Sequence, residues 1–115
     1  MRIPMIVLVL SAGILLADSA LAADATAGET QFKQLCATCH GPSGQGDGPA
    51  SASLNPKPRD LSSSEWQESV DDAHIRTVIT EGGPAVGLSP MMTAFGHLGD
   101  GDIDNLVAYI RSLDD

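Results

Sequence analysis

The sequence predicts an all-α domain of three to five helices. Several segments place apolar residues at the three- and four-residue spacing of one helix face, and none shows the alternation that is typical of a strand. Gly- and Pro-rich stretches separate these segments and mark loops. Both cysteines of the chain and a histidine stand together at the end of the first predicted helix, which indicates that the domain surrounds a prosthetic group.

Two helices are expected in the first half of the folded part. Residues 25–38 form the first helix, because Phe32, Leu35 and Cys36 lie on one face. Residues 41–58 follow as a loop rich in glycine and proline. Ser62-Ser63-Ser64-Glu65 matches a capping box and predicts a short helix that carries Trp66.

Two more helices are expected in the second half. Asp71 or Asp72 caps a helix that Gly82-Gly83-Pro84 ends, and a second loop then runs to about Gly99. The C-terminal helix has the clearest apolar face. That face consists of Ile103, Leu106, Val107, Ile110 and Leu113.

The run Cys36-Ala37-Thr38-Cys39-His40 carries the most specific chemistry in the chain. C-x-x-C-H is the attachment motif of a c-type haem. Residues three apart share one face of a helical turn, so both thiols can form thioethers with the two vinyl groups along one porphyrin edge. His40 follows directly and is the predicted proximal ligand of the iron.

Three other interpretations of the cysteine pair are less favourable. A thioredoxin-like redox pair needs a strand-helix-strand setting, which does not flank these residues. A structural zinc site needs four ligands, and the chain has no further cysteine. A disulfide between residues three apart would close a very small loop and would constrain little of the unfolded chain.

Residues 1–22 have the pattern of a cleaved secretory signal peptide. Arg2 precedes an almost wholly apolar run over residues 3–17, and Ala20-Leu21-Ala22 supplies a cleavage site. The run is shorter than the ~20 residues that span a bilayer, so an uncleaved anchor is the weaker interpretation. We therefore expect a folded domain over residues 23–115, exported to the periplasm and soluble, with no stable membrane insertion after cleavage.

The second loop should supply the other axial ligand. Met91 and Met92 are the methionines that remain after residue 22, and they stand in a Gly- and Pro-rich segment where packing alone gives little reason for them. A thioether is a soft, neutral ligand that favours ferrous iron and raises the reduction potential relative to two histidines. With both axial positions filled, the chemistry that remains is the transfer of one electron.

The chain resembles a small bacterial class I cytochrome c with one His/Met-ligated haem, and the resemblance covers nearly all of residues 23–115. Residues 41–50 are similar to the loop after the haem site in bacterial members, and residues 106–113 are similar to the last helix. The pattern Gly-x-x-x-Phe-x-x-x-Cys-x-x-Cys-His is matched by Gly28, Phe32, Cys36, Cys39 and His40.

The resemblance implies the class I cytochrome c fold, wrapped around one covalently attached haem c. The last helix should cross the first, with Gly28 and Phe32 near Tyr109. In the family the axial methionine is commonly followed by Pro-x-Phe-Gly, and Met92-Thr93-Ala94-Phe95-Gly96 fits that frame. The frame selects Met92 as the sixth ligand, with Met91 as the alternative because Thr93 replaces the usual proline.

Further site residues follow from the same resemblance. Pro49 is similar to the family proline whose carbonyl accepts a hydrogen bond from the proximal histidine, and Pro56 is the alternative. Three residues are candidates to bind the haem propionates, although surface solvation is the simpler interpretation of the two cations. They are Trp66, Lys57 and Arg59.

The chain has two further histidines, which are the remaining candidates for an axial ligand of the iron. His74 is expected to be a solvated surface residue because its neighbours are polar. His97 lies close to the methionines and is a second alternative to Met92.

The charge balance is acidic. The chain has a net charge of −9, and residues 23–115 alone keep five basic and fourteen acidic residues. Solubility explains this balance most simply, and steering toward a basic docking patch on a partner is the functional interpretation. Such a chain is a poor candidate for binding nucleic acid or anionic membranes.

These observations predict an electron carrier and not an enzyme. Single electrons would pass through the haem between larger redox proteins, which act as donors and acceptors. One alternative is a cytochrome c subunit of a periplasmic dehydrogenase or reductase complex. Another is a haem enzyme or gas sensor, which would require an open position on the iron.

Overall fold

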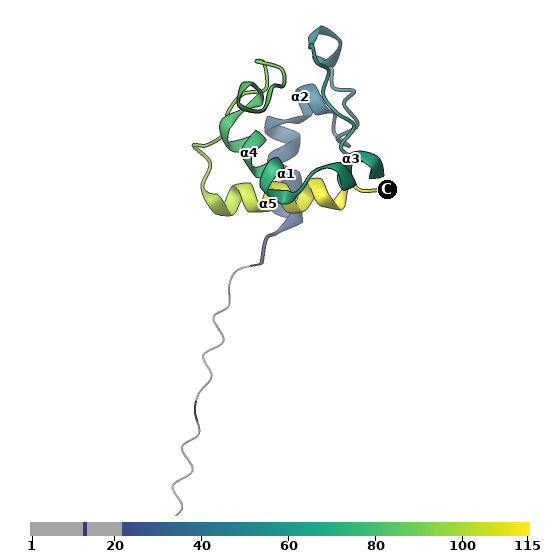
Figure 1. Cartoon of the computed structure of the whole chain (residues 1–115). Helices are drawn as coiled ribbons and strands as arrows, with labels where there is room; N and C mark the ends of the chain where they lie inside the picture. The colour runs from purple at the N-terminus through teal and green to yellow at the C-terminus, as the bar shows by residue number, and fades with distance from the viewer. Residues whose placement is uncertain (1–12, 14–21) are drawn as a thin grey trace, which may run out of the picture.

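The computed structural model describes residue 13 and residues 22–115, and these described residues contain helices and no strands (Figure 1). The all-α prediction is confirmed. The predicted signal peptide falls outside the described residues, apart from Gly13 and Ala22. The order of elements is α1 (Ala25–Leu35), α2 (Ala37–His40), the 3₁₀ turn η1 (Ser51–Ser53), α3 (Ser64–Ser69), α4 (Asp72–Glu81), the 3₁₀ turn η2 (Gly83–Val86) and α5 (Asp100–Ser112).

The closest packing in the fold is the crossing of α1 and α5, which pass over one another in Figure 1. A Cβ atom on Gly28 would stand 2.0 Å from the backbone oxygen of Asn105, so only glycine allows this approach. One turn further along α1, the ring of Phe32 lies 5.2 Å from that of Tyr109, measured between centroids. The crossing expected from the family resemblance is therefore confirmed.

The first predicted helix is divided in two. α1 ends at Leu35, and Cys36 takes a half-helical conformation with φ −117° and ψ −27°. The amide of Cys36 still donates to the carbonyl of Phe32 at 2.8 Å, and α2 then begins at Ala37. The predicted boundary at Thr38 is therefore wrong, and the break changes the direction in which Cys39 and His40 leave the helix.

Polar side chains define the starts of three helices. Asp24 caps α1 by accepting from the amides of Thr26 and Ala27, and Asp71 caps α4 by accepting from the amide of His74 at 2.8 Å. The predicted capping box before α3 does not form as expected, because Ser63 rather than Ser62 is the N-cap.

The observed N-cap of α3 lies one residue after the predicted one, and a hydrogen bond in the preceding loop explains this. The hydroxyl of Ser62 donates instead to the carboxylate of Asp60 at 2.6 Å, so it cannot cap the helix. As predicted, α4 ends at a glycine, Gly82.

The core is a cluster of apolar side chains contributed mainly by α1, α4 and α5. Four of the five residues predicted from helical spacing belong to it; Tyr109 is a further member on α5, and the predicted Leu113, the C-cap of that helix, is only partly buried. The buried residues are Phe32, Leu61, Ile75, Ile79, Ile103, Leu106, Val107, Tyr109 and Ile110. Because one side of this cluster also borders a cavity, the core positions the site described below.

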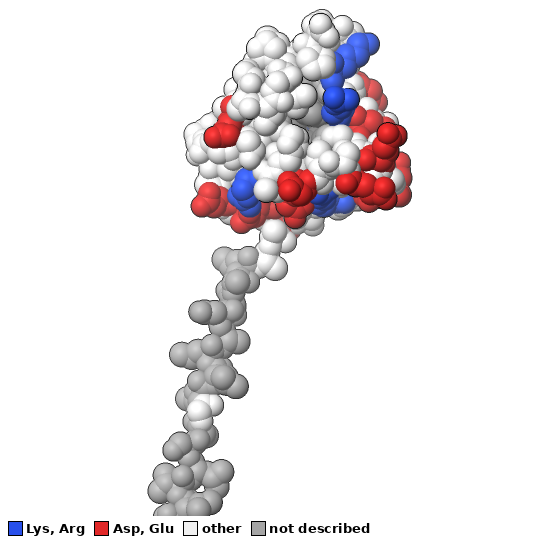
Figure 2. All heavy atoms as spheres, viewed as in Figure 1, with Lys and Arg blue, Asp and Glu red and all other residues white. Residues whose placement is uncertain are grey.

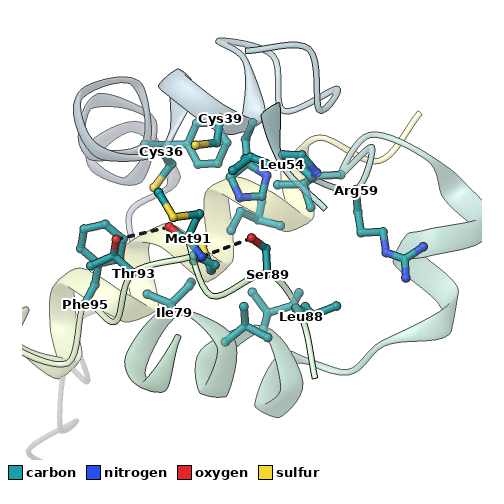
Figure 3. Close-up of a pocket in the computed structure, with 18 of the residues that line it drawn as sticks. Cys36, Cys39, Leu54, Arg59, Ile79, Leu88, Ser89, Met91, Thr93 and Phe95 are labelled. Atoms are coloured by element: carbon teal, nitrogen blue, oxygen red, sulfur yellow. Dashed lines mark hydrogen bonds between the residues drawn. The ribbon is translucent and has the colours of Figure 1, made fainter. Parts of the chain in front are cut away.

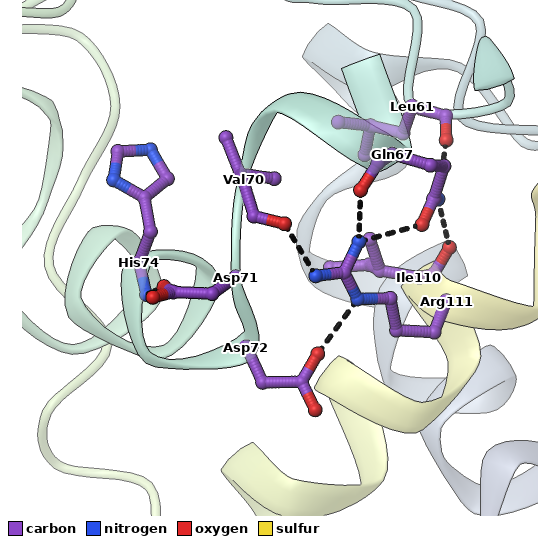
Figure 4. A network of polar contacts seen from close by, with 8 residues as sticks. All are labelled: Leu61, Gln67, Val70, Asp71, Asp72, His74, Ile110 and Arg111. Carbon is purple, nitrogen blue, oxygen red and sulfur yellow. Dashed lines mark hydrogen bonds and ion pairs between the residues drawn. The ribbon is translucent and has the colours of Figure 1, made fainter. Parts of the chain in front are cut away.

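A polar network fastens α3 to α5 (Figure 4). The side-chain amide of the buried Gln67 donates to the carbonyls of Leu61 and Ile110 at 2.7 and 2.8 Å. The guanidinium of Arg111 donates to the backbone and side-chain oxygens of Gln67 and to the carbonyl of Val70, and it pairs with Asp72 at 2.6 Å. The planar fork of arginine satisfies several acceptors at once, and a lysine could not.

Among residues 22–115, no helix is long and apolar enough to cross a membrane.

Replacing Gly28 by alanine should lower the free energy of unfolding by about 1–3 kcal/mol, because the added methyl group would push the two helices apart. Urea unfolding of the holoprotein, followed by circular dichroism, measures the change. Gly101→Ala is the matched control, since it lies on α5 with nothing within 4 Å of its Cβ position. We expect the control to be neutral or stabilising by about 0.5–1 kcal/mol. Equal effects of the two changes would contradict the close crossing.

Candidate functional site

A deep apolar cavity opens between α2, α4 and the two long loops (Figure 3). Its empty space is about 1160 Å³ when the open solvent at its mouth is included. Ile75, Val78 and Ile79 of α4 form one wall, as their helical spacing requires. Leu106 and Ile110 of α5 also line the cavity.

The predicted attachment residues lie on another part of this wall. Cys36, Cys39 and His40 all line the cavity, and both cysteines are free and half-buried. The loop after α2 holds this turn in place, because the amides of Gly46 and Gly48 donate to the carbonyls of His40 and Cys39 at 2.7 and 3.2 Å. A Cβ atom on Gly48 would come within 2.4 Å of a helix carbonyl, so glycine is needed for this contact.

Cys36 lacks the lowered pKa of a reactive cysteine. Burial raises the pKa of the Cys36 thiol to about 11, and the neighbouring Cys39 adds to the increase. At neutral pH the thiol is therefore protonated, whereas reactive cysteines have a lowered pKa and attack as thiolates. A buried, neutral thiol on an apolar wall is compatible with thioether attachment.

His40 has the protonation state and position of a metal ligand. Its ring packs against Phe32, with centroids 6.0 Å apart, and burial lowers the pKa of the imidazole, which favours the neutral form that binds metals. Its Nδ1 atom is buried and has no hydrogen-bond partner. The expected hydrogen bond to the carbonyl of Pro49 or Pro56 is thus not formed in this structure, and of these two prolines only Pro56 lines the cavity.

Both methionines of the second loop also line the cavity. The backbone of Met92 is held on two sides, since its amide donates to Ser89 and its carbonyl accepts from Gly83, each at 3.0 Å. Met92 is half-buried, whereas 66% of Met91 is exposed. In Figure 3 the loop that carries Met91, Ser89 and Thr93 runs between the cysteine wall and the α4 wall.

Comparison with known proteins identifies the fold. The profile of the family described as Cytochrome c matches residues 25–114. The chain belongs to the cytochrome c family.

Two solved structures resemble this cytochrome. One is a chain of the Kuenenia stuttgartiensis reducing HAO-like protein complex Kustc0457/Kustc0458, with 29% identity and a TM-score of 0.62 over 76% of this chain. This chain spans only 41% of the length of that one. The other is the KustC0563 c-type cytochrome, with 27% identity, a TM-score of 0.60 and coverage of 76% of this chain and 98% of that one.

Membership of the family implies a covalently bound c-type haem. The residues of the cavity fit such a group. Two thiols are available on one wall, a buried neutral imidazole follows them, and the remaining lining is mostly apolar. Nδ1 of His40 is buried without a hydrogen-bond partner, so no polar contact of this atom explains the position of the ring, whereas an iron bound through the other ring nitrogen would.

Two cations are among the residues that line the cavity. The three predicted propionate candidates, Lys57, Arg59 and Trp66, all line it. Within the described residues, Lys57 and Arg59 have no ion-pair partner. The other three cations each pair with a carboxylate, as Lys33–Glu29, Arg76–Asp104 and Arg111–Asp72. The cations near the cavity are therefore available to an anionic group.

The two further histidines lie in different surroundings. His74 is half-buried and lines the cavity, so its assignment to the solvated surface is wrong. It lies four residues before Val78 and thus shares the α4 face that borders the cavity, a signal present in the sequence. His97 is exposed, stacks on Phe95 with ring centroids 6.0 Å apart, and does not line the cavity.

Removing the charge of Arg59 should make the haem harder to reduce, because a nearby cation stabilises the electron-rich ferrous state. We expect Arg59→Gln to lower the reduction potential by about 20–60 mV, the size of one partly screened charge interaction. Spectroelectrochemical titration measures the shift. Lys33→Gln removes a cation that does not line the cavity and should leave the potential nearly unchanged. Equal shifts in the two variants would place Arg59 away from the haem.

Proposed function

We propose that this cytochrome is an exported, soluble carrier that transfers single electrons through one His/Met-ligated haem c. The observation that carries the proposal is the shared cavity, in which the C-x-x-C-H turn and the methionine loop form parts of one apolar lining. In this proposal Cys36 and Cys39 form the thioethers, His40 is the proximal ligand and Met92 is the sixth ligand.

When bound, the haem supplies an iron that gains or loses one electron. The chain's own residues hold the group and set its surroundings. A thioether is a softer ligand than a second imidazole, so ligation by His40 and Met92 would favour the ferrous state more than two histidines would. The apolar walls formed by α4 and α5 would shield the group from water, and if His40 and Met92 both bound the iron, no position would remain for substrate or oxygen. Catalysis by this domain is therefore not part of the proposal.

We also infer that residues 1–22 are a cleaved signal peptide and that residues 23–115 form the cytochrome domain in the periplasm. Covalent haem attachment takes place outside the cytoplasmic membrane, and the apolar run before Ala22 supplies the export signal.

A second candidate is a subunit of a larger redox complex. The similarity to one chain of an HAO-like complex favours it, although this chain spans less than half of that one. Affinity purification from the native source distinguishes the two roles. A free carrier should elute at the size of a small monomer, whereas a subunit should co-purify with a larger protein in fixed ratio. A haem enzyme or gas sensor would need the methionine position to be open.

The proposed function predicts a reversible one-electron couple and a closed iron site. Redox titration of the holoprotein, followed by its absorption spectrum, should give a single one-electron step. The ferrous protein should bind carbon monoxide weakly or not at all at neutral pH, because both axial positions are filled. Rapid, complete binding would instead support the enzyme or sensor. Haem that extracts fully into acidified organic solvent would contradict covalent attachment.

The sixth ligand can be assigned by a pair of matched variants. Met92→Ala should abolish the weak long-wavelength absorption of a methionine–ferric haem bond, lower the potential by about 100 mV or more, and open the iron to carbon monoxide. Met91→Ala should leave all three properties largely intact. The reverse pattern would assign Met91 as the ligand, and no effect of either variant would direct attention to His97 or to His74.

A further inference from the structure

The mouth of the cavity is bordered by three segments without a charged side chain. Residues 34–46, 48–56 and 82–99 contain no Asp, Glu, Lys or Arg. Each segment contributes residues to the cavity, among them Leu35 from the first, Leu54 from the second and Met91 from the third. We refer to the exposed parts of these three segments as the uncharged rim.

The uncharged rim also carries the exposed apolar side chains. Leu35 and Met91 are the large hydrophobic residues that are exposed among residues 22–115, with exposed fractions of 42% and 66%. Small uncharged residues around them, such as Pro84, Pro90 and Ala94, are exposed as well. Apolar side chains gathered at one opening, with few charges among them, are typical of the centre of a protein–protein interface.

The acidic residues lie elsewhere. None of the fourteen carboxylates in residues 23–115 lines the cavity. On the face that Figure 2 shows, most of the visible carboxylates lie toward α3 and α5, one acidic group stands apart at the left, and the surface over the loop between α4 and α5 is otherwise uncharged. The unpaired cations of the described residues, Lys57 and Arg59, border the mouth.

We propose that the redox partner docks on the uncharged rim with an apolar, uncharged surface of its own, and that the acidic residues stay outside the contact. This inference rests on the proposed electron-transfer function and names the partner that its site fits. A basic patch would find no carboxylate on the rim to pair with, and Lys57 and Arg59 would repel it at contact distance. A strongly acidic surface would find no cation within the three segments of the rim, since Lys57 and Arg59 lie outside them.

Screening makes the local charge more important than the net charge. A domain of this size has a radius of gyration of about 12 Å and is therefore about 30 Å across, and the Debye length at 0.15 M salt is about 8 Å. Carboxylates on the α3 and α5 side therefore contribute little to the energy of a contact at the rim. The sequence predicts a partner with a basic docking patch because the net charge is −9. The positions of the charged residues instead favour a partner with an uncharged, apolar surface.

Electron exchange between ferric and ferrous copies of the holoprotein provides the test. A second copy presents the same apolar, uncharged rim, so it serves as the probe for a partner of this chemistry. NMR line widths of mixed samples at 0.1 M salt give the exchange rate. The driving force is zero for every variant, so a small change in potential does not affect the comparison.

Four single variants distinguish the effect of where a charge lies from the effect of net charge on the exchange rate. Ala94→Glu and Ala94→Lys place a charge on the rim, between the cavity-lining residues Thr93 and Phe95. Gly101→Glu and Gly101→Lys place the same charges in the first turn of α5, where nothing lies within 4 Å of the added Cβ. Each rim variant thus has a control of equal net charge, and unchanged absorption spectra confirm unchanged haem ligation.

Both Ala94 variants should exchange about two- to threefold more slowly than their controls, because two copies then bring like charges together whatever the sign. The inference is overturned if the rates follow net charge alone, with the same effect at both positions. It is also overturned if Ala94→Lys is faster than Gly101→Lys, which would place the rim against an acidic surface. Failure of the proposed function itself would show earlier, as the absence of a reversible one-electron couple in the unmodified holoprotein.

Discussion

The approach of α1 to α5 at Gly28 is the constraint on which the rest of the structure depends. With the backbones in contact there, Phe32 lies beside both Tyr109 and His40. The direction of α1 then determines where the helix breaks at Cys36 and where the short α2 can lie. The haem-attachment turn is therefore held by a backbone contact three turns away, and a side chain at position 28 would displace it.

The second constraint is the small size of the domain. A chain of this length buries a limited apolar area, and part of its core faces a cavity rather than another side chain. Ile75, Ile79, Leu106 and Ile110 belong to both the core and the cavity lining. A haem in this cavity would complete their packing, so we expect the cofactor to contribute to folding as well as to function.

Much of this arrangement could be predicted from the sequence, because its signals are local. The spacing of Ile103 and Leu106 identifies α5, and the consecutive pattern of Cys36, Cys39 and His40 identifies the attachment turn. The remaining features depend on contacts between distant segments. The network of Gln67 and Arg111 joins residues more than forty positions apart and leaves no local pattern. The N-cap of α3 depends on the hydrogen bond between Ser62 and Asp60 in the preceding loop, which the helix pattern does not reveal. His74 lies on the cavity face of α4 although its neighbours in the sequence are polar, so those neighbours alone gave the wrong prediction.

The central claim is that one cavity brings His40 and a methionine to the same iron. Proton NMR of the reduced holoprotein, with methionine methyl groups labelled, tests it most directly. A methyl group bound above the haem experiences the full ring current, so our account predicts one methionine methyl resonance shifted far upfield and one near its ordinary position. Two methionine methyl resonances at ordinary positions would contradict the account, because no thioether would then be bound to the iron.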